Sequence, residues 1–379
     1  MGSKILQERN SSADGILLLD NPDYLFVTLA RSISKVAGHW KINSGDSLKE
    51  GKMKKWSLLV MFLLGASFFA PVPSLAGQNL DLGDAIGGPP DVPQRMILEY
   101  FCSEVLKRSN GEITIKYHPQ TIVTTETKAV EMTKMGSLAF CAIGGAAGTM
   151  FPNTQPLQMP YLIRDYAHYF ALVKSPIVKA MDEEIEKKHN LKVVFWFDWG
   201  FRQFVTSKKV INKVEDLRGL KLRVQPSPPL ADMMNAFGAS AVPISWSEAI
   251  PAVQQGVVDG MDVPVTTIIK FKIYEITKYA AITNHYFTAT PLLVNLKIWK
   301  GFTADQQKMM TQVGQEAANK EREMMEKADA DGKGTMERYG MQVTTPDLNP
   351  FRKIAQEKVY PKYYDKFGKE AFDKIWAVK

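Results

Sequence analysis

The sequence predicts an α/β fold with more than one domain. Apolar stretches with strand periodicity alternate with amphipathic helical stretches along most of the chain, which is typical of this class. The chain has 379 residues, more than one average domain needs, and its content of 45% apolar and 23% charged residues is ordinary for a globular protein. A strand–helix–strand unit follows residue 77, and such units build parallel sheets.

The N-terminal 76 residues are expected to lie outside this fold. Lys54 and Lys55 precede an apolar run over 56–70, and the small residues Ser74 and Ala76 follow it, a pattern typical of a secretory signal cleaved after Ala76. The apolar run is too short to span a bilayer, and a membrane anchor or a buried core helix is the competing interpretation. We therefore expect a soluble mature chain in the periplasm.

Residues 1–52 do not fit this pattern, because a signal peptide normally begins a chain. Met53 stands directly before the two lysines, where a start is expected. We therefore expect residues 1–52 to be a misassigned start or a non-structural extension and residues 53–76 to be the signal peptide.

The expected fold begins with a strand over 80–84, a helix over 94–107 and a strand over 112–118. Cys102 lies in this helix, and Cys141 lies in an apolar strand further along the chain. An exporting compartment permits a disulfide, but both cysteines stand in elements that are predicted to be buried. We expect them to be unpaired.

The middle of the chain carries three further strand patterns. An apolar strand over 193–197 is expected to end at Asp198-Trp199-Gly200, and the chain resumes in extended form over 201–206. The next strand, over 220–224, alternates apolar residues with Lys221 and Arg223, which places both cations on one face.

A helix over 230–237 is expected directly after that strand. Pro228 and Pro229 suit its first turn, and Gly238 suits its C-terminal cap. In open α/β sheets ligands collect beyond the carboxyl ends of strands, where Arg223 would lie. Composition alone would place a strand arginine in solvent instead.

Two capping-box patterns predict helix starts further along. Ser245-Trp246-Ser247-Glu248 opens a helix that contains Pro251, so the helix either starts later or is kinked. Thr303-Ala304-Asp305-Gln306 opens a helical pattern that could continue to about residue 339. Gly314 and the segment 332–334 are the points where this long helix is expected to bend or end.

Charge and motifs exclude several function classes. Without residues 1–76 the chain keeps 38 Lys and Arg (47 less nine) and 34 Asp and Glu (40 less six), a balance of +4 that is too mild for a nucleic-acid-binding face. No nucleophile elbow, zinc-binding helix or phosphate-binding loop occurs. We expect no catalytic residues, no metal and no cofactor. Four histidines stand singly, as expected for surface or capping positions: His118, His168, His189 and His285.

The glycine-rich segment 144–148, which begins at Gly144, has two interpretations. Its backbone N–H groups could cradle an anion, since it follows a predicted strand. It could also be a tight loop at the rim of a cleft, and its spacing fits no phosphate-binding fingerprint.

Several runs of sequence together resemble one family. They are LRGLKLRV, a helix ending in FGA, VPISWSEA and QQGVVDGMDVP, with GEITIKYHPQ, TTETKAVEMTKMGSL, PLQMPYLIRDYAH and WFDWGFRQFVTSKK upstream and FKIYEITKYAAITNH and TTPDLNPFRKIA downstream. In order and spacing they resemble the substrate-binding proteins of tripartite ATP-independent periplasmic (TRAP) transporters, the DctP family. The resemblance covers about residues 78–367.

The resemblance implies a two-lobed periplasmic binding protein fold with a long helix that spans both lobes. Residues 77–199 with 289–328 would form one lobe, and residues 200–288 with 329–379 the other. It also implies that a small organic acid binds between the lobes, and that the partner is a TRAP membrane permease. Such a protein is neither an enzyme nor membrane-spanning.

The resemblance also assigns roles to individual residues. Arg223 matches the family's principal carboxylate-binding arginine, and Arg202 matches a second arginine that often assists it. Trp246 matches an aromatic ligand contact, and Glu126 an acidic or polar residue near the ligand. An arginine suits an acid because its planar guanidinium pairs both carboxylate oxygens, which a lysine cannot do.

Two features of this sequence bear on the kind of acid. Val263 stands where many family members have an asparagine, so a polar sugar acid would lose hydrogen bonds there. Neighbouring Asp262 could help to hold a cation beside the ligand. Aromatic residues near the expected cleft point to a less polar acid, or else pack in the core: Trp196, Phe197, Trp199, Phe201, Tyr286 and Phe287.

Two alternative functions stay open. The same cleft could serve a periplasmic sensor or another transporter, in which case the protein partner would differ. A periplasmic enzyme on this scaffold is the third possibility, against which the missing catalytic motifs argue.

Overall fold

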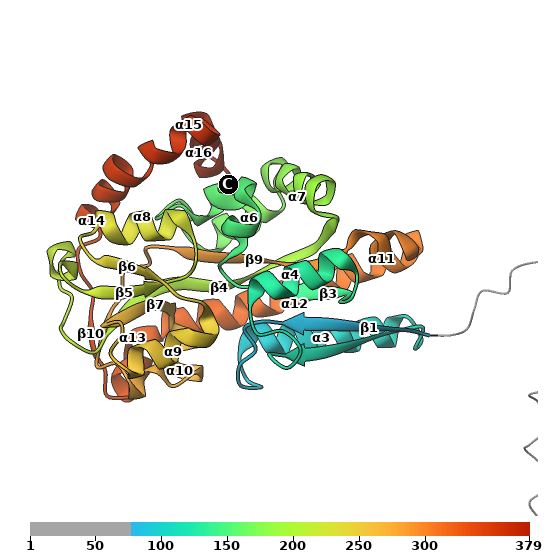
Figure 1. The fold of residues 1–379 in the computed structure, drawn as a ribbon, viewed down its shortest axis with the longest axis horizontal. Helices are drawn as coiled ribbons and strands as arrows, with labels where there is room; N and C mark the ends of the chain where they lie inside the picture. Colours follow the sequence, from blue (N-terminus) through green and yellow to red (C-terminus); the bar gives the residue numbers. More distant parts are fainter. Residues whose placement is uncertain (1–76) are drawn as a thin grey trace, which may run out of the picture. The chain divides into compact units, whose positions relative to one another are not determined.

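The computed structural model describes residues 77–379, which form an α/β fold (Figure 1). The predicted signal peptide over 53–76 and the extension over 1–52 lie outside the described residues. Within 77–379, none of the helices has the length and apolar character needed to cross a bilayer.

Ten strands form one network that consists of two half-sheets. The first half-sheet has the order β2-β1-β3-β9-β4. Strand β1 runs parallel to β2 and β3, whereas β9 is antiparallel to β3 and β4. The predicted strand–helix–strand start is therefore confirmed. Its elements are β1 (Gln78–Asp84), α3 (Pro93–Arg108), β2 (Ile113–Pro119), α4 (Glu126–Met135), β3 (Phe140–Ala142), β4 (Leu191–Thr206) and β9 (Phe287–Asn295).

The second half-sheet has the order β6-β5-β7-β4-β8-β10. Strands β5, β6 and β7 are parallel to one another, and β4 is antiparallel to β7 and β8. Its other strands are β5 (Lys221–Val224), β6 (Ser240–Pro243), β7 (Gly260–Pro264), β8 (Tyr279–Ala281) and β10 (Gln342–Thr344).

Strand β4 belongs to both half-sheets. The prediction of two strands separated at Asp198-Trp199-Gly200 is wrong, because the chain stays extended through this segment. The register of pairing with β9 shifts between Asp198 and Gly200, and beyond Phe201 β4 pairs with β7 and β8 instead. A β-bulge explains the misleading signal, since it places a glycine inside a continuous strand, here at a φ of 80°.

The helix after β5 forms as predicted. Helix α8 (Pro228–Ala236) begins with its two prolines in the first turn, and Gly238 follows it with a φ of 94°. Helix α9 (Trp246–Gln254) begins at the predicted serine, but Ser245 makes no side-chain capping bond, so the capping box is wrong there. Pro251 lies inside α9, which continues past it.

The long helix α12 (Ala304–Ala330) begins with the predicted capping box, in which Thr303 and Gln306 exchange side-chain-to-backbone bonds. It ends at the predicted glycine segment, and α13 (Gly332–Arg338) follows. Gly314 does not interrupt it, because the missing side chain is needed for packing: a Cβ there would lie 2.4 Å from Phe195 Cδ1. Helix α12 packs on α3 and β4 and also contacts α10 and α13.

The C-terminal helices cover α8 (Figure 1). Lys362 and Tyr363 both reach Asp232 on α8, and Arg164 donates to the carbonyl groups of Trp376 and Val378. The remaining helices are α5 (Ala147–Met150), α6 (Tyr166–Val173), α7 (Pro176–His189), α10 (Val265–Lys270), α11 (Leu296–Gly301), α14 (Asn349–Ile354), α15 (Pro361–Phe367) and α16 (Lys369–Trp376), with short turns η1 (Pro152–Gln158), η2 (Val214–Leu217), η3 (Ile273–Glu275) and η4 (Ala355–Val359).

Candidate functional site

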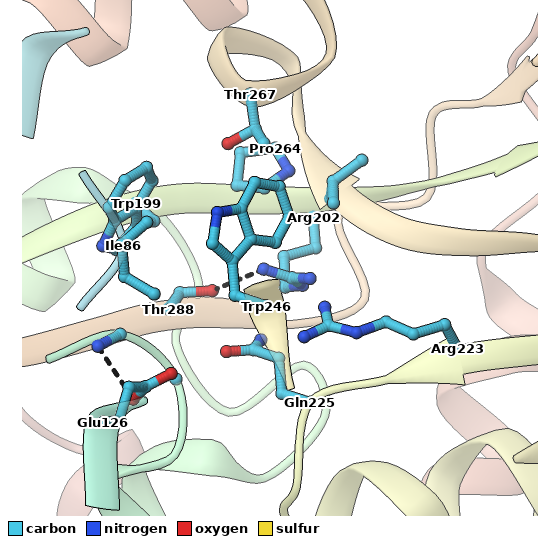
Figure 2. A pocket seen from close by; sticks show the side chains of 13 residues that line it. Ile86, Glu126, Trp199, Arg202, Arg223, Gln225, Trp246, Pro264, Thr267 and Thr288 are labelled. Atoms are coloured by element: carbon cyan, nitrogen blue, oxygen red, sulfur yellow. Dashed lines mark hydrogen bonds between the residues drawn. The ribbon is translucent and has the colours of Figure 1, made fainter. Parts of the chain in front are cut away.

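One cavity lies where the two half-sheets meet, with about 350 Å³ of empty space that is partly open to solvent (Figure 2). Both half-sheets and their helices contribute to its wall. The lining residues are Ile86, Glu126, Gly144, Gly145, Trp199, Arg202, Arg223, Gln225, Trp246, Val263, Pro264, Thr267 and Thr288. Seven of the eight residues proposed from the sequence are among them, and Asp262 is the exception.

Arg223 lies at the carboxyl end of β5, where the strand pattern predicted it. Its side chain is 1% exposed, and Nε donates to the carbonyl of Ile244 at 2.8 Å. Nη1 is buried and has no partner, and among residues 77–379 no carboxylate lies within ion-pair distance of this guanidinium. Burial lowers the pKa of Arg223 to about 10, with a further contribution from the charge of Arg202. Arg223 is therefore a buried cation without a counter-ion.

Arg202, by contrast, already has a carboxylate partner. Its Nε lies 2.6 Å from Asp262 Oδ2, and Nη2 donates to the carbonyl of Asp262. Burial alone would raise the pKa of Asp262, but the charge of Arg202 and the contact with His285 outweigh it, so the pKa lies below its usual value. The expectation that Asp262 lines the cleft is wrong: it is fully buried behind Arg202 and neutralises it.

His285 belongs to this buried group, so the expected surface position is wrong. It is 0% exposed, stacks on Phe204, and its Nε2 lies 3.5 Å from Asp262 Oδ2. Burial lowers its pKa. His168 is also buried, between the backbone of Arg164 and Ile375. A single histidine in the sequence carries no signal of burial, which explains the error at His285, whereas His168 occupies a capping position as expected.

Glu126 stands at the first turn of α4 and is fixed by the glycine-rich loop. Its Oε2 accepts from the backbone N–H of Gly144 at 2.9 Å and of Ala146 at 3.1 Å. The N–H groups that could have cradled a bound anion therefore hold a side-chain carboxylate. Burial raises the pKa of Glu126, although these two bonds and the charge of Arg223 oppose the rise. Figure 2 shows Glu126 and Arg223 on opposite sides of the cavity.

Trp246 and Trp199 provide the aromatic part of the wall. The guanidinium carbon of Arg223 lies 5.8 Å from the ring centre of Trp246, which in turn packs edge-on against Phe271. Trp199 is 6% exposed, and its Nε1 is buried without a partner. Val263 lines the same cavity and offers only apolar atoms at its side chain.

The other aromatic residues of the predicted cluster do not line this cavity but pack in the core, so they carry no information about the acid. Phe201 and Phe287 pack against each other and against Tyr166, while Trp196 donates to Asp182. Phe197 and Tyr286 are each 1% exposed in the core.

Gly145 belongs to the glycine-rich segment already considered, so sequence reasoning missed five of the lining residues, and for one of them a signal was available. Gln225 follows Arg223 at the carboxyl end of β5, where the same rule predicts a ligand contact, and its Nε2 is buried without a partner. Gln225 lies against Gly145, where a Cβ would lie 1.4 Å from Gln225 Oε1, so any larger residue at 145 would displace the Gln225 amide. The other four are Ile86, Pro264, Thr267 and Thr288.

A second cavity adjoins the first and shares Ile86, Glu126 and Trp246 with it. Thr127 of α4 lies on one side of it and Ser247 of α9 on the other. It has about 440 Å³ of empty space, part of which is open solvent.

The chemistry of the site is that of an anion receptor. The buried wall groups without a partner include three N–H donors, at Arg223, Gln225 and Trp199. Buried polar groups are normally hydrogen-bonded, so unpaired donors around an empty space indicate that a ligand with acceptor atoms completes them. Among residues 77–379, no three His, Cys, Asp or Glu side chains are arranged to hold a metal ion.

Comparisons with known proteins give a consistent result. Residues 86–366 match the family model described as "Bacterial extracellular solute-binding protein, family 7" (DctP). A solute-binding protein of Verminephrobacter eiseniae is 28% identical over 285 residues, which cover 74% of this chain and 84% of that protein. The sialic acid-binding periplasmic protein of Vibrio cholerae is 26% identical over 333 residues, which cover 86% of this chain and 100% of that protein.

Solved structures are similar as well. A TRAP periplasmic solute-binding protein from Polaromonas, bound to D-erythronate, has a TM-score of 0.76 and 26% identity over 80% of this chain and 99% of its own. Another, from Xanthobacter autotrophicus with bound β-D-galacturonate, has a TM-score of 0.73 and 27% identity over 79% of this chain and all of its own. These likenesses confirm the expected two-lobed binding-protein fold.

Proposed function

Since the chain belongs to the DctP family of bacterial extracellular solute-binding proteins, we propose that it captures an organic acid in the cavity between its half-sheets. Binding pairs the carboxylate of the acid with Arg223, and the lobes close around it. Closure excludes water, which strengthens the ion pair. The protein performs no covalent chemistry in this role; it shifts between open and closed states.

The unpaired guanidinium of Arg223 carries this proposal. A buried charge without a partner is costly, and proteins retain one where a ligand supplies the counter-charge. Arg202 cannot take the same role alone, because Asp262 occupies its Nε and one Nη. Arg202 instead offers Nη1, which lies 3.5 Å from Thr288 Oγ1, as a secondary contact.

The acid we propose has an apolar flank beside its carboxylate. Val263, Pro264 and Ile86 offer carbon atoms to the ligand, and a hydroxyl placed against Val263 would lose its hydrogen bond at a cost of about 1 to 3 kcal/mol. Trp199 Nε1 and Gln225 Nε2 can each donate a hydrogen bond to an acceptor atom elsewhere on the ligand. The structural relatives carry bound D-erythronate and β-D-galacturonate, so these two acids serve as polar comparators beside acids that have an apolar flank.

Thermal shift with a panel of organic acids tests this function. A ligand at 100 times its Kd stabilises the native state by about 2.7 kcal/mol, which a melting curve resolves easily. We expect the wild-type chain to respond to at least one acid, and Arg223→Ala to lose that response while it still melts cooperatively. Arg223→Lys should recover little of it, because an ammonium cannot pair both carboxylate oxygens.

A matched control is Arg322→Ala, which removes an arginine on α12 whose partner is Glu326. It should bind the acid as the wild type does. If Arg223→Ala still bound its acid normally, the assignment of the carboxylate contact to Arg223 would be wrong.

We further propose that the exported protein delivers its acid to a TRAP membrane permease. The support is family membership and the likeness to TRAP solute-binding proteins. A periplasmic location follows the family and the expected signal peptide over 53–76. Cross-linking of the acid-loaded protein in cells, followed by mass spectrometry, separates this partner from a sensor kinase or another transporter. Recovery of a kinase instead of a permease would support the sensor alternative.

A further inference from the structure

Two fully buried carboxyl side chains, one partly exposed carboxyl side chain and one buried amide meet where β4 passes from one half-sheet to the other. Asp198 lies at the β-bulge, Glu321 and Asp329 lie on α12, and Gln94 lies on α3. Asp198 and Glu321 are 0% exposed and Gln94 is 1% exposed. We call these four residues the hinge cluster. None of them lines the acid-binding cavity.

The hinge cluster contains many acceptors and few donors. Glu321 Oε2 accepts from the backbone N–H of Asp198 at 3.0 Å, and Asp329 Oδ2 accepts from the hydroxyl of Tyr166 at 2.8 Å. The Gln94 amide donates to the carbonyl of Asp198 at 2.7 Å. The other acceptor atoms lack a hydrogen bond of good geometry, namely both Oδ atoms of Asp198, Oε1 of Glu321, Oδ1 of Asp329 and Oε1 of Gln94. The backbone N–H groups of Gly200 and Phe201 and the amide of Gln94 still lie close enough to oppose in part the rise in the pKa of Asp198, Asp329 and Glu321, respectively.

No cation compensates these carboxyl groups. Within residues 77–379, no Lys, Arg or His lies within 4.0 Å of Asp198, Glu321 or Asp329. The groups that face them are neutral or acidic: Tyr166 and Tyr169 from α6, Gln94 from α3, and Met325 and Glu326 from α12. Arg322, the nearest arginine along α12, pairs with Glu326 and lies over the ring of Phe170.

A proton is the smallest group that can satisfy such a cluster. Two carboxylates that share a dry site cannot both be ionised cheaply, whereas a protonated carboxyl becomes a donor to its neighbour. Burial raises the pKa of Glu321, and the charge of Asp198 raises it further. Burial also raises the pKa of Asp198, with a contribution from Asp329. Burial raises the pKa of Asp329 itself to about 6.

Because of where the cluster lies, its protonation state affects how one half-sheet moves against the other. Strand β4 and helix α12 are the elements that contact both half-sheets, so motion of one half against the other has to bend or shift them. Gly200 in the bulge lies against the cluster and the residues that surround it: a Cβ there would lie 3.7 Å from Asp329 Oδ2, and 2.7 Å from Met325 Cε and from Tyr166 Oη. Repulsion between Asp198 and Glu321 acts directly between β4 and α12.

We propose that Asp198 and Glu321 are both protonated where β4 meets α12, and that loss of a proton from this pair shifts the protein towards an open cleft. The described conformation keeps the cluster dry, so it belongs to the protonated form. Two ionised carboxylates need water, which enters when α12 moves away from the bulge. The cleft therefore opens as the pH of the surroundings rises and closes as it falls. Only the consequence for acid affinity rests on the proposed function, because the motion itself needs no ligand.

An interlobe distance measured on the ligand-free protein tests the proposal. Lys128→Cys on α4 and Glu248→Cys on α9 place labels on exposed positions beside Thr127 and Ser247, on opposite sides of the second cavity. The native Cys102 and Cys141 are buried and free. Pulsed spin-label spectroscopy between pH 5.5 and pH 8.5 then gives the distance distribution. We expect the population of the longer distance to rise by about tenfold relative to the shorter one, the change that follows from one pKa unit of coupling.

Neutral variants of similar shape identify the groups responsible. Glu321→Gln, alone and with Asp198→Asn, should hold one distance distribution at both pH values. Glu323→Gln, on the same helix and exposed, should shift as the wild type does. An unchanged wild-type distribution across this pH range would overturn the proposal, as would a Glu321→Gln variant that still opens with pH. If no acid binds, the proposed function is wrong, but a pH-dependent interlobe distance in the ligand-free protein would still support the protonation proposal.

Discussion

At the residue scale, the two arginines of the cleft differ in what surrounds them. Arg223 could be identified from the sequence, because a strand pattern ends there and the carboxyl end of a strand faces the ligand. The partner of Arg202 could not, because Asp262 reaches it only through the antiparallel register that sets Arg202 opposite Pro264. Sequence patterns give the face of a strand but not the side chain on the neighbouring strand.

We expect Asp262→Ala to destabilise the fold by about 3 to 5 kcal/mol, because it leaves the Arg202 guanidinium buried without a counter-charge. Urea denaturation measures this loss. Asp373→Ala, which removes a carboxylate on α16 paired with Lys369, both of them well exposed, should cost clearly less. Equal losses for the two variants would show that the Arg202 pair contributes no more than a surface pair.

Val263→Asn tests the link between this position and the kind of acid. The amide would offer a donor and an acceptor in the cavity wall, so a hydroxylated acid should gain up to about tenfold in affinity relative to its deoxy analogue, as expected for one hydrogen bond. Calorimetric titration of both acids against both proteins measures the ratio. If the ratio does not change, Val263 does not select the ligand.

At the element scale, β4 and α12 show what local patterns reveal. The start and end of α12 were predictable, because a capping box and a glycine segment are local signals. The continuity of β4 was not, because Asp-Trp-Gly in a strand pattern is read as a stop unless the neighbouring strands are known. The buried role of Asp198 was hidden for the same reason.

Gly314→Ala on α12 should destabilise the protein by about 1 to 3 kcal/mol through overpacking against Phe195. The better helix propensity of alanine, about 1 kcal/mol, works in the opposite direction and is expected to lose. Gly301→Ala on α11 is the matched control, since a Cβ there meets nothing within 4 Å. Thermal unfolding of both variants gives the comparison, and a stabilised Gly314→Ala would contradict the packing seen here.

Asp198→Asn and Glu321→Gln should also change how stability depends on pH. The native pKa of each carboxyl lies above its unfolded value, so the native state keeps a proton that the unfolded chain loses above about pH 4. This contribution to stability is full below pH 4 and is lost as the pH rises through the native pKa. At pH 8 we expect each neutral variant to be more stable than the wild type, with a free energy of unfolding about 1 to 3 kcal/mol larger. Guanidinium denaturation at pH 5 and pH 8 tests this, and a gain of equal size at both values would argue against titration as the cause.

At the scale of the whole molecule, the two-lobed architecture came from the family resemblance and not from composition. No Ser/Gly-rich linker marks a boundary, because β4 and α12 carry the chain across as regular elements and the remaining crossing, residues 282–286 between β8 and β9, has an ordinary composition. The proposed lobe boundaries at residues 199 and 289 fall next to the β4 bulge and inside β9.

Export defines one further expectation for the whole chain. The secreted protein should begin at Gly77, one residue before β1. Intact mass measurement of the protein recovered from the periplasm checks this, and a mass that includes residues 53–76 would place the processing site elsewhere.

The shared strand β4 also limits how this protein could be divided. A fragment cut after residue 199 would keep the first half-sheet but lose β9, which is the hydrogen-bonded neighbour of both β3 and β4. Strands β3 and β4 would then each have an unpaired edge, and exposed apolar edges pair with the strands of other chains and aggregate. Expression of such a fragment alone should give insoluble aggregates, while its coexpression with residues 200–379 restores the missing neighbour in trans. Reconstitution from two halves is therefore expected to depend on β9 more than on any loop.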